Sequence, residues 1–181
     1  GYLYNGDLVY YIISDRLVWP QYQAGLVMKH IIPSAKIDNS KEQRIIEIFT
    51  KASKKLGIYN GPVYSQMKVK DDSIYIIEIT PRWDGCHLWR PIYYLTGINF
   101  LKTTFMHLSN NLYKMCNIKN KYQSRYELCF LYDKPFNRAD YTKFDIPNDV
   151  IYSFRYYKEG DLIRPVNNIY EKIGYYIREI K

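Results

Sequence analysis

The chain has 181 residues, of which 47% are hydrophobic and 24% charged, and its formal net charge at pH 7 is +8. This composition is too apolar for a disordered segment and lacks the periods of collagen or a coiled coil. Three cysteines are too few for a disulfide framework. The longest apolar run, Leu8 to Ile13, is too short to span a bilayer. We therefore expect a soluble, cytoplasmic globular protein without a membrane partner.

The positive charge and the 21 tyrosines raise the question of a nucleic-acid or saccharide ligand. Lysine and arginine are spread evenly along the chain, which favours a solvated lysine-rich surface over a basic binding stripe. Tyrosine shares A/T-rich codons with the abundant Ile, Lys and Asn, so codon bias explains it more simply than a stacking platform does. We expect no nucleic-acid partner.

Strand signals open the chain. Residues 2–4 and 8–14 are strand-like, and the Asn-Gly dipeptide at 5–6 predicts a hairpin turn between them. Residues 17–37 contain scattered Pro and Gly and are expected to be irregular.

The clearest helix signal covers residues 40–57. Ser40 and Gln43 have the spacing of a capping box, apolar residues then recur at helical spacing, and Gly57 is placed as a C-terminal cap. A second helical stretch, 88–110, is expected to break at Thr96-Gly97.

The remaining elements are mostly strands. Residues 63–70 and 74–80 predict an antiparallel hairpin with a three-residue loop, packed on one face by the helix 40–57. Further on, the strand-like segments are 126–132, 150–157 and 162–166, and 169–179 is either a strand or a short helix. The fold class is therefore α+β, and we expect a first domain over 1–115 and a β-rich C-terminal appendage over 116–181.

The candidate metal-binding and phosphate-binding side chains lie between Gln66 and Arg82. Alternate residues of a strand share a face, so Glu78 and Thr80 project together, and the predicted register places Gln66 opposite Glu78 with Cβ atoms roughly 5 Å apart. Oxygen donors of this kind suit Mg²⁺ or Mn²⁺ and not zinc. Arg82 suits a phosphate oxygen. The alternative is an ordinary hairpin with a polar, solvated face, although a carboxylate between Ile77 and Ile79 favours a function, because burial of an unpaired charge is costly.

These residues resemble the C-terminal part of the ATP-grasp superfamily, in its carbamoyl-phosphate-synthase-like and carboxylate–amine ligase branch. The segments that carry the resemblance are Gly61 to Gln66, Ile77 to Arg82, Gly85, and Gly97-Ile98-Asn99. The likeness covers residues 1–110 and implies the C-terminal lobe of an ATP-grasp fold, an antiparallel sheet with packing helices.

The resemblance implies roles for four residues. Gln66, Glu78 and Thr80 map onto the ligands of the Mg²⁺ (or Mn²⁺) ions that bridge the ATP phosphates, and Arg82 maps onto the catalytic arginine near the transferred phosphate. Thr80 stands where the family usually has Asn, a departure that puts the second metal in doubt. Similar enzymes use ATP to activate a carboxylate as an acyl phosphate, which an amine or another nucleophile then attacks.

Three further residues are candidates for substrate binding. Arg16 ends a predicted strand, where a surface role is the alternative, and His87 and Arg90 lie in the segment after Arg82, where similar enzymes build part of the acceptor pocket. His30 is weighed for the same cleft, against a structural role.

The resemblance also implies that most cofactor-binding residues, including a Gly-rich phosphate loop, precede the matched segment. We therefore expect a C-terminal fragment that is inactive alone, with the remainder upstream in the same chain or in a partner chain, and a possible homo-oligomer. The expected partners are small-molecule carboxylate and amine substrates. Two alternatives stay open: a non-enzymatic module that binds anionic saccharide or nucleic acid, and a degenerate grasp domain kept as a scaffold.

Overall fold

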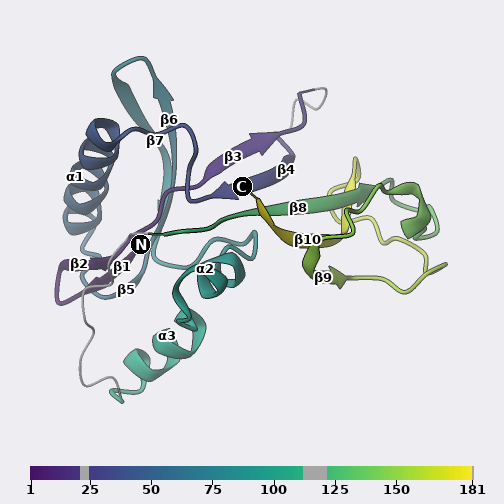
Figure 1. The fold of residues 1–181 in the computed structure, drawn as a ribbon. Helices are drawn as coiled ribbons and strands as arrows, with labels where there is room; N and C mark the ends of the chain where they lie inside the picture. The colour runs from purple at the N-terminus through teal and green to yellow at the C-terminus, as the bar shows by residue number, and fades with distance from the viewer. Residues whose placement is uncertain (21–24, 112–121, 181) are drawn as a thin grey trace. The chain divides into compact units, whose positions relative to one another are not determined.

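The structure, a computed structural model, describes residues 1–20, 25–111 and 122–180. The chain divides into two compact units, each made of two segments (Figure 1). Unit 1 contains Gly1–Ile13 and Ser34–Gln123, and unit 2 contains Ser14–Pro33 and Ser124–Lys181. The predicted domain boundary between 115 and 116 lies outside the described residues and stays a prediction.

Unit 1 begins with a small antiparallel sheet. Its strand order is β2-β1-β5, with β1 at Tyr2–Tyr4, β2 at Asp7–Tyr10 and β5 at Gly61–Pro62. The Asn-Gly turn forms as predicted, because Asn5 and Gly6 both take the positive φ that a tight hairpin requires (51° and 85°). The predicted strand over 8–14 ends early, at Tyr10, and the chain then leaves for unit 2.

Helix α1 (Asn39–Lys55) confirms the predicted helix with a different N-terminal cap. The Asp38 carboxylate accepts a hydrogen bond from the Lys41 backbone N–H at 2.9 Å, so the expected capping box of Ser40 and Gln43 is wrong. Phe49 of α1 is buried in a small core with Leu3 and Val63. This core joins the helix to the first sheet.

Two shorter helices, α2 (Trp89–Thr96) and α3 (Phe100–Leu108), confirm the broken helical stretch. Gly97 ends α2 in the left-handed conformation (φ 71°), which glycine adopts without steric cost. Phe100 is fully buried among aromatic rings, 4.4 Å from Tyr10 and 5.2 Å from Trp83 between ring centroids. Among the described residues, no helix has the length and apolarity needed to cross a membrane.

Unit 2 is built on an antiparallel sheet of order β3-β4-β8-β10-β9. Its strands are β3 (Asp15–Val18), β4 (Val27–Ile32), β8 (Arg125–Asp133), β9 (Val150–Arg155) and β10 (Glu171–Ile180). The expectation that 17–37 is irregular is therefore wrong. Two short strands fit within it because its Pro and Gly residues fall outside β3 and β4.

The C-terminal strands were largely predictable. The segments 126–132 and 150–157 are confirmed as β8 and β9, and 169–179 is a strand (β10) and not a helix. The predicted strand over 162–166 is wrong, since only a single bridge joins Leu162 to Arg138. A second core forms from β8, β10 and the chain that connects them. Its buried members are Leu131, Ala139, Tyr141, Ile163, Ile173 and Tyr176.

A buried carboxylate holds the loop before β10. Glu171 Oε1 accepts hydrogen bonds from the backbone N–H groups of Val166, Asn167 and Asn168, at 2.7, 2.6 and 3.0 Å. Desolvation by burial acts to raise the pKa of Glu171, but these bonds outweigh it and the pKa is lowered from its usual value. The ionised carboxylate therefore stabilises unit 2.

We predict that Glu171→Gln lowers the free energy of unfolding by about 1–3 kcal/mol near neutral pH, because the charge that attracts three N–H groups is lost. The Glu171 pKa is lower in the folded than in the unfolded state. Its contribution is thus full above the unfolded value of about 4.3 and disappears as the pH falls through the folded value. Urea unfolding should show the parent and the variant converging in acid.

Glu179→Gln is the matched control, because Glu179 is an exposed carboxylate on the same strand. It should change stability little at any pH. An equal loss in both variants would mean that general surface charge, and not the hydrogen bonds to Glu171, carries the effect.

Candidate functional site

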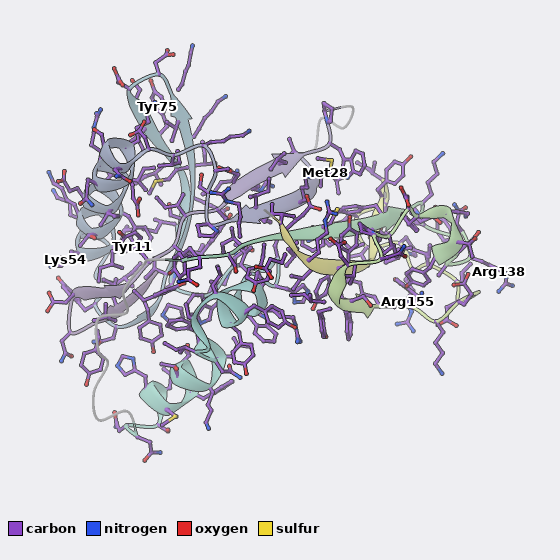
Figure 2. All side chains as sticks on the ribbon, in the orientation of Figure 1. Tyr11, Met28, Lys54, Tyr75, Arg138 and Arg155 are labelled. Carbon is purple, nitrogen blue, oxygen red and sulfur yellow. The ribbon has the colours of Figure 1, made fainter. Side chains whose placement is uncertain are left out.

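The candidate site is built on the hairpin of β6 (Tyr64–Lys70) and β7 (Ser73–Thr80) in unit 1. Lys70 pairs with Ser73, so the turn has two residues and the predicted three-residue loop is wrong. A β-bulge between Gln66 and Met67 then shifts the register by one residue and places Gln66 opposite Glu78, as predicted. Tyr75, labelled in Figure 2, marks β7 near the turn.

The two faces of the hairpin differ in chemistry. Thr80 pairs with Tyr64 and Glu78 pairs with Gln66, so the polar side chains of Gln66, Glu78 and Thr80 share one face. On the other face, Met67 and Ile79 pack against the core that contains Phe49 of α1. The prediction that α1 covers one face of the hairpin is confirmed.

The expected burial around Glu78 is wrong. Glu78 is exposed, and Ile77 beside it is 58% exposed. Ile77 is the residue that the bulge leaves without an opposite residue on β6, and the sheet has only two strands, so neither residue is enclosed. The Glu78 carboxylate is therefore solvated, and the cost of burial is no longer an argument for its function.

Thr80 supplies a different argument. Its Oγ1 is buried and has no hydrogen-bond partner among the described residues. A buried hydroxyl without a partner is costly, and native structures seldom contain one without a reason. A cation bound beside Glu78 and Gln66 would give this oxygen a partner. The donors present (a carboxylate, an amide and a hydroxyl) fit Mg²⁺ or Mn²⁺, which prefer oxygen ligands.

Arg82 lies two residues after Thr80, just beyond the end of β7. Its backbone N–H donates to the Thr80 carbonyl at 2.9 Å, which folds the chain back at the end of β7. The guanidinium is exposed, and its Nη1 donates to the Trp83 carbonyl at 2.9 Å. A guanidinium fixed in this way has further N–H donors for an anion.

His87 lies just before α2, and Arg90 lies in its first turn. The Arg90 backbone N–H donates to the His87 carbonyl at 3.0 Å, and His87 has a positive φ of 60°. The Arg90 guanidinium carbon lies 4.5 Å from the centroid of the Trp89 ring, a cation–π contact. The two predicted substrate residues thus lie in one turn of the chain.

Arg16, the remaining predicted residue, lies on β3 of unit 2. Its side chain is exposed, and Nη2 donates to the Gly25 carbonyl at 3.0 Å. Its role in substrate binding stays a prediction.

Solved structures show where this fold occurs. The chain superposes on phosphoribosylglycinamide synthetase from Anaerococcus prevotii with a TM-score of 0.74 and 19% identity, covering 98% of this chain and 46% of that one. For the L-amino acid ligase from Bacillus licheniformis the TM-score is 0.69 and the identity 18%, covering 84% and 39%. A third match is the biotin carboxylase domain of the Hydrogenobacter thermophilus 2-oxoglutarate carboxylase, crystallised with MgADP, ADP and bicarbonate. Its TM-score is 0.64 and its identity 14%, and the match covers 88% of this chain and 36% of that one.

These similarities confirm the predicted ATP-grasp fold and its α+β class. The chain spans less than half the length of each of these structures. No protein-family model and no curated protein sequence matches it. The likeness is therefore one of fold.

We predict that Mn²⁺ added to residues 1–181 broadens the backbone NMR signals of Gln66, Glu78 and Thr80, because it binds the polar face of the hairpin. Glu78→Gln should weaken this binding by about tenfold or more, since it removes the only charged donor of the three. Asp72→Asn, which neutralises an exposed carboxylate in the turn of the same hairpin, should leave it unchanged. Broadening centred on the turn and insensitive to Glu78→Gln would contradict the site.

Proposed function

We propose that the chain is part of an ATP-dependent ligase of the carbamoyl-phosphate-synthase-like, carboxylate–amine type. Such an enzyme activates a carboxylate as an acyl phosphate with Mg-ATP and joins it to an amine or a similar nucleophile. The observation that carries the proposal is the set of oxygen donors on one face of β6–β7, where the buried Thr80 hydroxyl has no hydrogen-bond partner among the residues that the structure describes. The ATP-grasp fold supports it, since the neighbours include a synthetase, a ligase and a carboxylase domain solved with MgADP.

The proposal gives each donor a separate part. A bound Mg²⁺ would neutralise charge on the phosphates during transfer, the usual dominant contribution in phosphoryl transfer. Glu78 supplies the negative donor, and the neutral oxygens of Gln66 and Thr80 complete the protein's share of the ligands. Arg82, at the end of the same strand, binds a phosphate oxygen through its guanidinium.

Substrate binding is assigned to the segment that follows Arg82. His87 and Arg90 lie in one turn at the start of α2 and are proposed to act on one substrate. Arg16 is proposed to bind a substrate carboxylate. The whole protein would act in the cytoplasm on small molecules, together with the rest of the ATP-binding residues.

The two alternatives make different demands on Glu78. A module that binds anionic saccharide or nucleic acid gains nothing from an exposed carboxylate, which repels its ligand unless a metal intervenes. A degenerate grasp domain kept as a scaffold does not need oxygen ligands for a metal ion. Its supporting feature is Thr80, where the family usually has Asn.

In the whole protein that carries this chain, Glu78→Gln should abolish ADP release, because the negative donor is lost. Gln66→Ala should reduce activity less, since water can replace a neutral amide oxygen on Mg²⁺, which commonly keeps several waters. Thr80→Asn should be tolerated or raise activity. The measurement is the steady-state rate of ADP release as a function of Mg²⁺ concentration.

Asp72→Asn on the same hairpin serves as the control and should retain the parent's rate. If Glu78→Gln retains turnover and alters only the melting temperature, Glu78 is structural and the proposed enzyme function is wrong. If none of the three variants differs from an already inactive parent, the scaffold alternative holds.

Residues 1–181 alone should release no ADP and bind ATP only in the millimolar range. The proposed reason is that most phosphate and adenine contacts belong to parts of these enzymes outside the matched region, which is 46% or less of each neighbour. Calorimetry with ATP and Mg²⁺ checks this, and a submicromolar dissociation constant would contradict it.

A further inference from the structure

The guanidinium of Arg82 is held by the residue that follows it. Arg82 Nη1 donates to the Trp83 carbonyl at 2.9 Å. A carbonyl points in a fixed direction only when its peptide plane is fixed, because the backbone dihedrals on either side of that plane rotate easily. The orientation of the guanidinium therefore depends on what holds Trp83.

A side-chain hydrogen bond ties Trp83 to α3. Its indole Nε1–H donates to Thr104 Oγ1 at 3.1 Å, across 21 residues of chain. The Thr104 hydroxyl in turn donates to the Phe100 carbonyl at 2.7 Å, one turn earlier in the same helix. Since its own proton is used in this way, Thr104 Oγ1 is an acceptor for the indole, which has only a donor to offer.

Ring packing restrains the same indole. The Trp83 ring centroid lies 5.2 Å from that of Phe100 and 6.1 Å from that of Tyr2, and the Tyr2 and Phe100 centroids are 6.2 Å apart. Aromatic rings at such separations attract one another. All of these residues belong to unit 1. The side chain of Trp83 is thus anchored within unit 1, while its carbonyl binds the exposed Arg82 side chain.

Thr103, the preceding residue of α3, offers a comparison. Its hydroxyl makes the same kind of bond within the helix, to the Asn99 carbonyl at 3.2 Å. Consecutive residues of a helix project about 100° apart, so Thr103 does not share the direction of Thr104. The bond to the Trp83 indole is therefore the feature that distinguishes the two threonines.

We propose that Trp83 and Thr104 are positioning residues for Arg82. Helix α3 holds the indole through Thr104, the anchored indole fixes the Trp83 backbone, and the Trp83 carbonyl holds the guanidinium in one orientation. A guanidinium oriented in advance loses less side-chain entropy when it binds an anion. The benefit for catalysis rests on the proposed ligase function, in which Arg82 binds a phosphate oxygen.

The first test needs no activity and uses ¹⁵N relaxation of the side-chain N–H groups in residues 1–181. In the parent, the Arg82 Nε–H bond should have a higher order parameter than that of Arg44, an exposed arginine on α1. Thr104→Val keeps the side-chain shape and removes the acceptor. It should shift the Trp83 indole signal and lower the Arg82 order parameter below about 0.6, the range of flexible groups.

Thr104→Ser keeps the hydroxyl and should retain both signals of the parent, as should Thr103→Val, the matched control. The same Arg82 order parameter in the parent and in Thr104→Val would overturn the proposal, and so would an equal fall in Thr103→Val. If Thr104→Val is too unstable to measure, Trp83→Phe takes its place with the same expected result, because it keeps an aromatic ring and removes the N–H.

The second test is a double-mutant cycle in the whole protein. Thr104→Val should slow ADP release by about two- to tenfold, the effect of one neutral hydrogen bond. Measured on the residual rate of Arg82→Ala, the same change should have almost no effect, because a residue that acts through Arg82 contributes nothing once the guanidinium is gone. Equal losses in both backgrounds would mean that Thr104 only stabilises the fold, which would also overturn the proposal.

This proposal and the proposed function can fail separately. If the NMR responses are as expected but Arg82→Ala retains the parent's rate of ADP release, the positioning of Arg82 stands and its role in phosphoryl transfer is wrong. If Arg82→Ala lowers ADP release strongly while the Arg82 order parameter does not respond to Thr104→Val, the proposed function stands and the positioning by Trp83 and Thr104 is wrong.

Discussion

The register of the β6–β7 hairpin is the constraint on which the candidate metal site depends. Side chains alternate between faces, so a slip of one residue would carry Gln66 away from Glu78 and Thr80. The two-residue turn alone would impose that slip, and the bulge beside Gln66 cancels it. The bulge also leaves Ile77 exposed, an apolar residue kept in a solvated position by the register that the polar face requires.

Local patterns in the sequence were sufficient to predict the helices and strands around this site. The apolar spacing of α1, the break at Gly97 and the alternation in β7 each depend on neighbours within a few residues, and each was predictable. The predicted pairing of Gln66 with Glu78 is correct, although the turn assumed for it was not, because the bulge and the shorter turn offset each other. A bulge has no reliable signature in a single sequence.

Features that depend on distant segments were not predictable. The strands β3 and β4 are short and are flanked by Pro and Gly. They pair with each other, and β4 also pairs with β8, about 100 residues later in the chain. His30 itself was weighed, but its burial is a property of the folded chain and has no local signal in the sequence.

The order in which unit 2 is assembled has a consequence for its synthesis. Its segments 14–33 and 124–181 flank almost all of unit 1, so β4 leaves the ribosome about 100 residues before its partner β8. At translation rates of about 5–20 residues per second, this edge waits roughly 5–20 s for its hydrogen-bond partner. During that interval the outer edge of β4 is an unpaired strand edge that other chains can pair with, a hazard that chaperones limit.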